Sequence, residues 1–426
     1  MEQYVQMKNS GVSWIQDIPV SWGVRVLFQL ADQVKNKNKD LMERNLLSLS
    51  YGRIKRKDIN NPEGLLPESF DGYNIIETND IVLRLTDLQN DHTSLRVGQA
   101  TERGIITSAY TTLRPSGLVN PQYLYYVLHA YDLIKGFYGM GAGVRQGLNY
   151  DEVKTIRVPF PPIAEQQAIA DYLDDQVYQI DSIIEDAKSS IEEYKTWKRS
   201  IIHEAVTKGV KKGVVTRDSG ISWIGEVPLH WGMRKIKNGF SIISGATPKS
   251  DMPEYWDGDV VWITPADYKT DDKYVGNGRR NLSQEGYASC GTTIVPEGSI
   301  IFSKRAPVGT VAINSIPLCT NQGCLSCIPN STANSEYFYY AMSVFTEQFE
   351  LFSSGTTFKE ISATTFANFA MVYPPMEEQV EIAQYLTAKC SELDSIRNEK
   401  QRLIEDTEVY KRSLIYETVT GKRKVV

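Results

Sequence analysis

The sequence is dominated by an internal duplication. Two blocks recur in the same order, and the first pairs Ser10–Leu27 with Ser219–Ile236, identical at 9 of 18 positions. The second pairs Pro161–Thr207 with Pro374–Thr420, identical at 20 of 47 positions without a gap. Unrelated segments would match at about one position in twenty, so the chain contains two copies of one design.

Between these blocks the similarity weakens without vanishing. Ile75–Arg84 resembles Ile294–Ser303, and Asn120–Tyr126 resembles Asn334–Tyr340. Loops on a rigid scaffold usually carry recognition. A shared frame with divergent loops therefore favours two lobes that present different surfaces in equivalent poses, although duplication alone does not identify the ligand.

Each second block predicts a long helix. It opens with Pro-Pro and places an acid in the first turn, which is typical of a helix start. Gly209 and Gly421 are expected to end the two helices. In the first copy, apolar residues alternate at spacings of four and three along one seam: Leu173, Val177, Ile180, Ile184, Ala187, Ile191, Tyr194, Ile201 and Ala205.

The second helix keeps only part of this seam, because Arg397, Lys400 and Lys411 replace apolar residues. We therefore expect the two helices to pack antiparallel against each other, with Trp197 and Tyr410 at matching places. Forty-odd residues make a rod of ~65–70 Å. Such a rod could space two lobes over half-sites ~34 Å apart on duplex DNA, or it could be a helical hairpin that merely joins them.

The expected fold class is α+β, with two similar lobes separated by two long antiparallel helices in an internal pseudo-twofold repeat. A single core stops growing near ~250–300 residues, and the chain has 426. The predicted segments are a first lobe at 1–160, a first spacer helix at 161–212, a second lobe at 213–373 and a second spacer helix at 374–426.

Composition narrows the functional classes. The net charge of −6 argues against a nonspecific basic coat for DNA, so any DNA contact must come from local basic clusters. No signal peptide or long apolar run is present, and we expect a cytoplasmic protein. The five cysteines are expected to be free thiols, and their spacing matches no standard zinc site, so no metal is expected.

The combination of an S-G-[IV]-x-W-[IL]-x-x-[IV]-P-x-x-W opening, a Pro-Pro-x-x-Glu-Gln helix start and the duplication of both resembles the specificity subunits of type I restriction-modification systems. The second lobe also resembles that family in Gly245–Lys249, Trp262–Pro265 and Thr320–Cys324, whereas the first lobe lacks the Gly-x-Thr-Pro element. The resemblance implies two target-recognition domains that read a bipartite, asymmetric DNA site.

The resemblance also implies that this chain is not an enzyme. Two modification subunits would methylate adenine with S-adenosylmethionine, and restriction subunits would use ATP and magnesium, while this chain binds double-stranded DNA and docks both, with no cofactor of its own. The sequence agrees, because Phe160–Ile163 and Tyr373–Met376 lack the amide or acid of a methylase motif and no P-loop is present. Gly139–Gly143 is interpreted as a loop near DNA rather than a nucleotide site.

DNA contacts are expected from loop residues, since phosphates attract Lys and Arg while amide, hydroxyl and guanidinium groups match base edges. Each cluster could equally be a solvated surface. In the first lobe the candidates are Lys35, Lys37, Lys39, Arg53, Lys55, Arg56, Lys57, Arg84, Arg145 and Gln146. In the second lobe they are Thr247, Lys249, Thr264, Lys269, Lys304, Arg305, Thr357 and Lys359.

Two aromatic stretches, Tyr123–Tyr126 and Tyr337–Tyr340, are predicted to form the core of a short helix rather than to stack on bases. Two other functions remain open from the sequence alone. One is an enzyme that itself methylates or cuts DNA, and the other is a scaffold whose helices organise protein partners without DNA.

Overall fold

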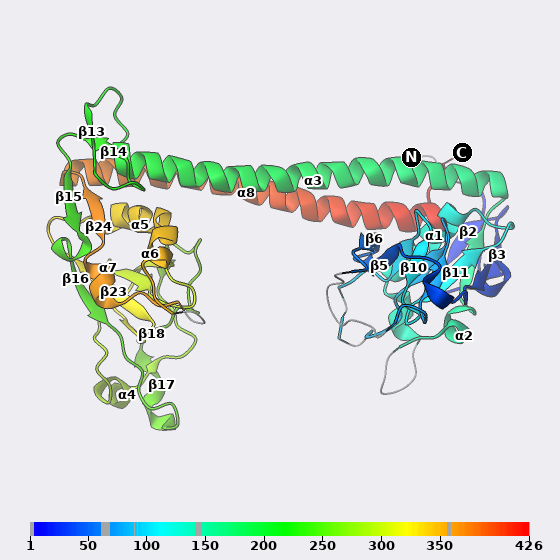
Figure 1. Cartoon of the computed structure of the whole chain (residues 1–426), viewed down its shortest axis with the longest axis horizontal. Helices are drawn as coiled ribbons and strands as arrows, with labels where there is room; N and C mark the ends of the chain where they lie inside the picture. The colour runs from blue at the N-terminus through cyan, green and yellow to red at the C-terminus, as the bar shows by residue number, and fades with distance from the viewer. Residues whose placement is uncertain are drawn as a thin grey trace. The chain divides into compact units, whose positions relative to one another are not determined.

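The computed structural model of the chain describes residues 4–60, 69–88, 90–91, 93–140, 147–355 and 359–425 (Figure 1). The chain forms two compact units. Unit 1 comprises Met1–Lys188 together with Gln401–Val426, and unit 2 comprises Ser189–Lys400. Each unit therefore contains one lobe and a part of both long helices, whereas the sequence treated the helices as segments of their own.

Unit 1 contains two four-stranded sheets, ordered β6-β5-β10-β7 and β4-β11-β8-β9, and two strand pairs, β1-β2 and β12-β3. The strands are β1 (Met7–Asn9), β2 (Asp17–Pro19), β3 (Gly23–Val26), β4 (Ala31–Gln33), β5 (Leu46–Ser50), β6 (Arg53–Lys57), β7 (Asn74–Ile76), β8 (Ile81–Leu83), β9 (Val97–Gln99), β10 (Gly104–Ile106), β11 (Thr111–Pro115) and β12 (Arg157–Phe160). The lobe's α-helices are α1 (Pro121–Leu133) and α2 (Tyr150–Val153).

Unit 2 is built around a five-stranded sheet ordered β16-β23-β20-β21-β19, with the strand pairs β13-β14, β15-β24 and β18-β22. The strands are β13 (Thr216–Asp218), β14 (Glu226–Pro228), β15 (Gly232–Lys235), β16 (Phe240–Ser244), β17 (Trp256–Val260), β18 (Trp262–Ile263), β19 (Tyr274–Val275), β20 (Ile300–Ser303), β21 (Val311–Asn314), β22 (Cys319–Thr320), β23 (Cys324–Pro329) and β24 (Ala370–Tyr373). The α-helices are α4 (Gln284–Ala288), α5 (Ser335–Val344), α6 (Thr346–Leu351) and α7 (Ala363–Ala367).

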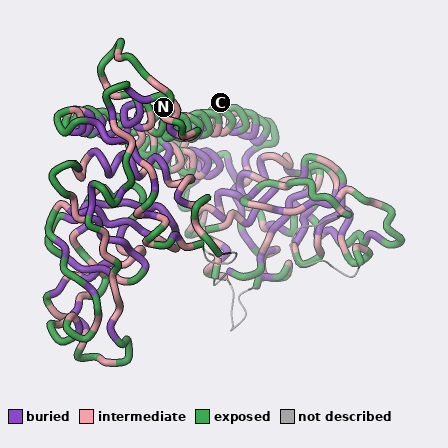
Figure 2. The backbone as a smooth tube through the Cα atoms, turned by 60° about the vertical axis from the view of Figure 1, so that its left-hand side comes forward, coloured by how far each residue is buried: buried purple, intermediate pink, exposed green. Residues whose placement is uncertain are grey.

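The cores form where strands and helices bury apolar side chains. Figure 2 shows buried residues, in purple, gathered along interior segments of the chain, with exposed residues, in green, along outer ones. Strand β23 has a core on each of its faces, because Cys324 packs in one cluster and Cys327 in another. The two thiols therefore lie on opposite faces of the strand. The mixed helix-and-sheet class expected from the sequence is confirmed.

The two long helices are α3 (Ile163–Lys208) and α8 (Met376–Val419). Both end as predicted, because Gly209, directly after α3, and Gly421, two residues after the end of α8, adopt φ values of +81° and +72°. Only glycine adopts such angles readily. A Cβ at Gly421 would also lie 2.3 Å from Cδ of Pro19, so the chain passes against the lobe of unit 1 at this point.

Within each unit the segments of α3 and α8 run antiparallel. In unit 1, Asp181 of α3 forms an ion pair of 2.6 Å with Lys411 of α8. In unit 2, Lys198 of α3 forms an ion pair of 2.7 Å with Asp394 of α8. Of the charged residues that interrupt the apolar seam, Lys411 is thus matched by a carboxylate of α3, whereas Arg397 pairs with Asp271 of the lobe and Asp394 of its own helix.

The repeated Pro-Pro-x-x-Glu-Gln motif anchors the helices to the lobes in the same way in both units. Glu165 accepts a hydrogen bond of 2.9 Å from Nε1 of the buried Trp22. Glu378 accepts one of 3.0 Å from Nε1 of Trp231. Gln166 and Gln379, which follow these glutamates, are buried. They accept hydrogen bonds from the backbone N–H groups of Asn120 and Asn334, the N-cap residues of α1 and α5.

The aromatic stretches form lobe helices, as predicted. Tyr123 in α1 and Tyr337 in α5 are fully buried. Their hydroxyls donate to backbone carbonyls at the end of a long helix: Tyr123 to Val419 at 3.3 Å and Tyr337 to Val206 at 3.0 Å. Each lobe is therefore held at the start of one long helix and at the end of the other.

His129 gives unit 1 a pH-dependent stability. Its side chain is buried in α1 and stacks on Tyr125, with ring centroids 5.6 Å apart. Burial, assisted by the charge of Lys411, lowers the pKa of His129 from 6.5 to about 4. Between pH 6.5 and pH 4, the imidazole is therefore protonated in the unfolded chain but neutral in the folded chain. Acidification from pH 7 to pH 5 thus lowers the free energy of unfolding of unit 1 by about 2 kcal/mol through this residue.

Asp132 acts in the opposite direction, since burial raises its pKa to about 6 and the folded chain gains a proton there as the pH falls. The effect of His129 is therefore isolated by comparison with His129→Gln. Denaturant unfolding at pH 7 and pH 5 should show the unsubstituted chain losing about 2 kcal/mol more than the variant. Equal losses in both proteins contradict a buried, neutral His129.

Candidate nucleic-acid interface

The clearest basic surface of unit 1 is strand β6 at the edge of its sheet. Tyr51 and Gly52, with φ values of +49° and +77°, make the tight turn that joins β5 to β6. Side chains alternate along a strand, so Arg53, Lys55 and Lys57 share one face. The sequence placed these candidates in a loop, and the structure corrects this: they form a regular row, which we call the basic row.

The members of the basic row differ in their partners. Arg53 forms an ion pair of 3.0 Å with Asp181 of α3. Arg56, on the opposite face of β6, donates from Nε to Glu102 at 2.7 Å and lowers the pKa of that carboxyl. Lys55 and Lys57 are exposed, and neither forms an ion pair with any residue that the structure describes. These two lysines are the members best placed to meet phosphates.

The other candidates of unit 1 are more scattered. Lys35 and Lys39 are exposed, and Lys37 donates to the carbonyl of Gly72 at 2.8 Å. Arg84 is half-buried after β8. Arg145 and Gln146 lie outside the described residues. Asn38, which the sequence interleaves with the three lysines, is fully buried and bonds to the backbone of Glu43, so it is not available to a base edge.

Unit 2 brings together residues of three segments on which the family resemblance rests, 245–249, 262–265 and 320–324. We call the residues 245–249, 262–267 and 320–323 the loop cluster. The Thr247 hydroxyl bonds to the side-chain oxygen of Gln322. Trp262 Nε1 donates to the carbonyl of Ala246 at 3.0 Å. A Cβ at Gly245 would lie 2.1 Å from the carbonyl oxygen of Thr320, so only glycine permits this close approach of two backbones.

Asp267 organises the loop cluster from within. Its carboxylate accepts bonds from the backbone N–H and the hydroxyl of Thr264, at 2.7 and 2.6 Å. It also accepts from the backbone N–H of Arg279 at 3.0 Å. Sequence reasoning missed Arg279 and Gln322. The Thr320–Cys324 motif was the signal for Gln322, whereas nothing local marks Arg279.

The remaining candidates of unit 2 lie beside this cluster or on exposed surface. Lys304 and Arg305 share the carboxylate of Glu360, at 2.9 and 3.7 Å. The backbone N–H of Lys304 donates to the carbonyl of Gly323, which ties this pair to the loop cluster. Lys249, Lys269 and Lys359 are exposed, and Thr357 lies outside the described residues.

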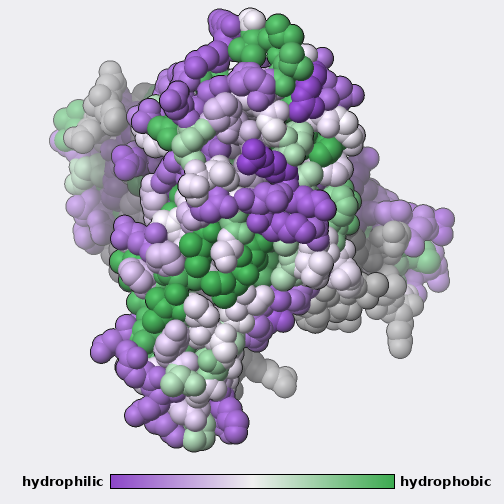
Figure 3. All heavy atoms as spheres, turned by 90° about the vertical axis from the view of Figure 1, so that its left-hand side faces the viewer, coloured by the Kyte–Doolittle hydropathy of each residue, from purple (hydrophilic) through white to green (hydrophobic). Residues whose placement is uncertain are grey.

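The face of unit 2 seen in Figure 3 is neither uniformly hydrophilic nor uniformly hydrophobic. Hydrophobic residues form a patch on it, bordered by hydrophilic ones.

Among the described residues, no group of three or more His, Cys, Asp and Glu side chains is placed to hold a metal ion. In the same part of the chain, no helix is long and apolar enough to cross a membrane.

The sequence is similar to those of type I restriction enzyme specificity subunits. The MjaIX type I restriction enzyme specificity subunit of Methanocaldococcus jannaschii is 39% identical over 167 residues, which cover 38% of this chain and 39% of that protein. A putative MjaX specificity subunit of the same organism is 25% identical over 438 residues, which cover 99% of this chain and 98% of that protein.

Solved structures share the fold. A chain from a structure that describes complex assembly and conformational transition of the type I R-M system has a TM-score of 0.73 at 13% identity, and the match covers 95% of this chain and 99% of that one. The HsdS subunit from Thermoanaerobacter tengcongensis has a TM-score of 0.53 at 14% identity and covers 95% and 98%. The family described as type I restriction modification DNA specificity domain matches residues 69–193 and 228–405. The chain thus belongs to the family of type I restriction-modification specificity subunits.

Proposed function

We propose that the chain reads a bipartite, asymmetric DNA site, with one half-site assigned to the lobe of each unit. The observation that carries this proposal is the repeated anchoring of two unlike lobes by one set of contacts. Glu165 and Glu378 bind equivalent tryptophans, and Tyr123 and Tyr337 bind equivalent helix ends. A scaffold that is repeated with different loops suits a protein whose two lobes recognise different DNA sequences.

The two lobes offer different chemistry to a duplex. Unit 1 presents the basic row, whose lysines suit phosphates. Unit 2 presents the loop cluster, where hydroxyl, amide and guanidinium groups of Thr247, Gln322 and Arg279 match the donors and acceptors of base edges. The half-sites are therefore expected to differ in sequence, as an asymmetric target requires.

The paired helices are proposed to set the interval between the half-sites. Both α3 and α8 continue from one unit into the other without a break. A helix advances 1.5 Å per residue, so helix length fixes a distance that a flexible linker would not. The ion pairs Asp181–Lys411 and Lys198–Asp394 support one register of the pair.

The chain is proposed to act without catalysing a reaction itself. In that role it docks two modification subunits, one for each unit, because the two units repeat one design. Those subunits supply S-adenosylmethionine-dependent adenine methylation, and restriction subunits supply ATP- and magnesium-dependent cleavage. Double-stranded DNA is the ligand of the chain itself.

Selection of DNA from a random pool by the chain in complex with its modification subunits tests the proposal. At raised salt, where phosphate contacts alone are weak, the retained molecules should share two short defined segments separated by a constant number of undefined bases. A single continuous motif contradicts the two-reader arrangement. Retention of random and selected duplexes with equal affinity contradicts sequence reading and favours a protein scaffold.

A further inference from the structure

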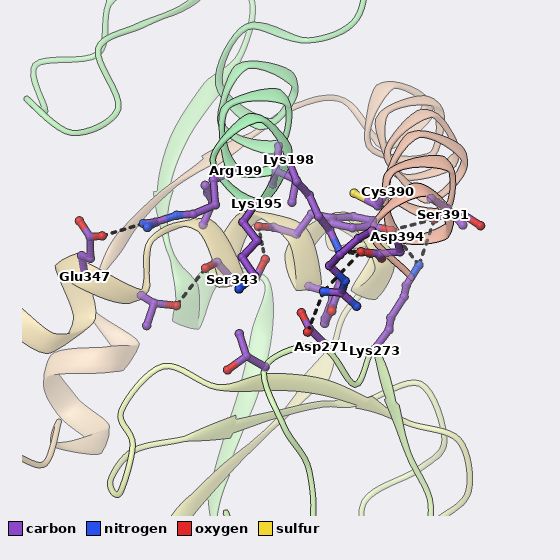
Figure 4. A pocket seen from close by; sticks show the side chains of 18 residues that line it. Lys195, Lys198, Arg199, Asp271, Lys273, Ser343, Glu347, Cys390, Ser391 and Asp394 are labelled. Carbon is purple, nitrogen blue, oxygen red and sulfur yellow. Dashed lines mark hydrogen bonds and ion pairs between the residues drawn. The ribbon is translucent and has the colours of Figure 1, made fainter. Parts of the chain in front are cut away.

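A cavity of about 640 Å³ lies inside unit 2, between the long helices and the lobe (Figure 4). Its walls come from α3, α8, α5 and the segment 270–273. Figure 4 shows Lys195, Lys198 and Arg199 projecting from α3 on one side and Cys390 and Asp394 from α8 on the other. Small-molecule sites usually have volumes of roughly 300–1,000 Å³, so the cavity has the size of an organic ligand.

We propose that this cavity binds a small organic phosphate with a flat apolar body, for which a mononucleotide is the representative class. Lys195 and Arg199 lie one turn apart on α3 and therefore face the same side. Both are more than half exposed, at 53% and 59% of the side chain. These two cations are the proposed phosphate anchors.

The present partners of the two anchors are easily exchanged. Lys195 pairs with Glu192 and Arg199 pairs with Glu347, and the two carboxylates are 71% and 66% exposed. Ion pairs between exposed groups contribute little to stability. A phosphate in the cavity replaces these carboxylates with a bidentate partner for the guanidinium, which is the stronger interaction.

The rest of the lining suits a flat body. Ile202 and Val344 supply apolar surface, and the ring of Tyr339 forms part of the wall. The Tyr339 hydroxyl forms no hydrogen bond with any residue in the described part of the chain, so it remains a donor for a ligand. On the far side, Lys273 is fixed by Thr387 Oγ1 at 3.0 Å and by its position over the Tyr340 ring.

The repeat supplies an internal comparison. At the positions equivalent to Ser343 and Lys195, unit 1 has His129 and Glu408. The imidazole of His129 is buried against Tyr125, the counterpart of Tyr339. Unit 1 thus replaces a small side chain by a ring and a cation by an anion, so the proposed site is confined to unit 2.

Titration calorimetry of the full chain with adenosine 5′-monophosphate tests the proposal. We expect saturable binding at one site per chain, with adenosine and inorganic phosphate each at least tenfold weaker. Arg199→Gln should weaken binding at least tenfold, whereas Arg412→Gln, at the equivalent exposed position of unit 1, should leave it unchanged. Ser343→His introduces the residue of unit 1 and should abolish binding.

Several results overturn the proposal. One is that no binding is measured at millimolar adenosine 5′-monophosphate. Another is that adenosine or inorganic phosphate binds as tightly as the nucleotide. A third is that Arg199→Gln and Arg412→Gln change the affinity equally. If thermal unfolding shows that Ser343→His does not fold, the comparison of Arg199→Gln with Arg412→Gln still tests the proposal. Both arginines are exposed, so neither substitution should prevent folding.

Discussion

Replacing Lys55 and Lys57 together by glutamine should lower the affinity of the chain for its target duplex by roughly 60-fold at 0.1 M salt. Each phosphate contact releases about 0.9 of a counterion, which corresponds to a factor of about 8 at that salt concentration. The slope of log affinity against log salt should become shallower by about 1.8 for the two contacts. Affinity measured from 0.05 to 0.3 M salt provides both quantities.

The matched control removes two lysines of equal charge from exposed positions outside the basic row. Lys188→Gln and Lys208→Gln together change the net charge identically. Their salt slope should stay close to that of the unsubstituted chain. If both double variants change the slope equally, the effect reflects total charge, and the basic row has no special position on DNA. The preferred target sequence should be unaltered in either case, because phosphate contacts carry no base information.

Lengthening both long helices by seven residues should widen the undefined gap of the target by about three base pairs and leave the two half-sites unaltered. Seven residues add ~10.5 Å and close to two full turns, so the helix faces keep nearly the same orientation. The insertions belong after Lys188 in α3 and after Lys400 in α8, where the chain passes from one unit to the other. Selection from random DNA measures the gap.

A matched insertion makes the result specific. Seven residues placed after Lys212, beyond the end of α3, add the same length outside the helices and should leave the gap unchanged. A helix-lengthened chain that retains the original gap is incompatible with a helical ruler.

The long helices could be predicted closely because their signals are local. The Pro-Pro pair, the acidic first turn and the terminal glycines lie within a few residues of the ends that they define, and α3 ends at Lys208, directly before Gly209. The function of the Glu-Gln pair could not be predicted. Its partners, Trp22 and Asn120, lie 143 and 46 residues away along the chain, and no periodic pattern reports such distant pairings.

The candidate interface shows the same limit. The sequence identified the basic cluster at 53–57, but its strand depends on a turn in which Tyr51 adopts a positive φ that tyrosine seldom adopts. The ion pair of Arg53 with Asp181 joins residues 128 positions apart. A cluster of charges can therefore be located from sequence, whereas the charges that are already paired become known only from the structure.

The division of the chain between the units has a consequence for biosynthesis. Unit 2 uses only the continuous stretch from Ser189 to Lys400, whereas unit 1 needs Gln401 and the residues after it to pair with the start of α3. During synthesis, the first lobe therefore exposes the apolar surface that it buries against α8 until the last residues of the chain are available. The part of the polypeptide that emerges first is the last to be completed, and a chaperone that shields nascent chains would act on that half.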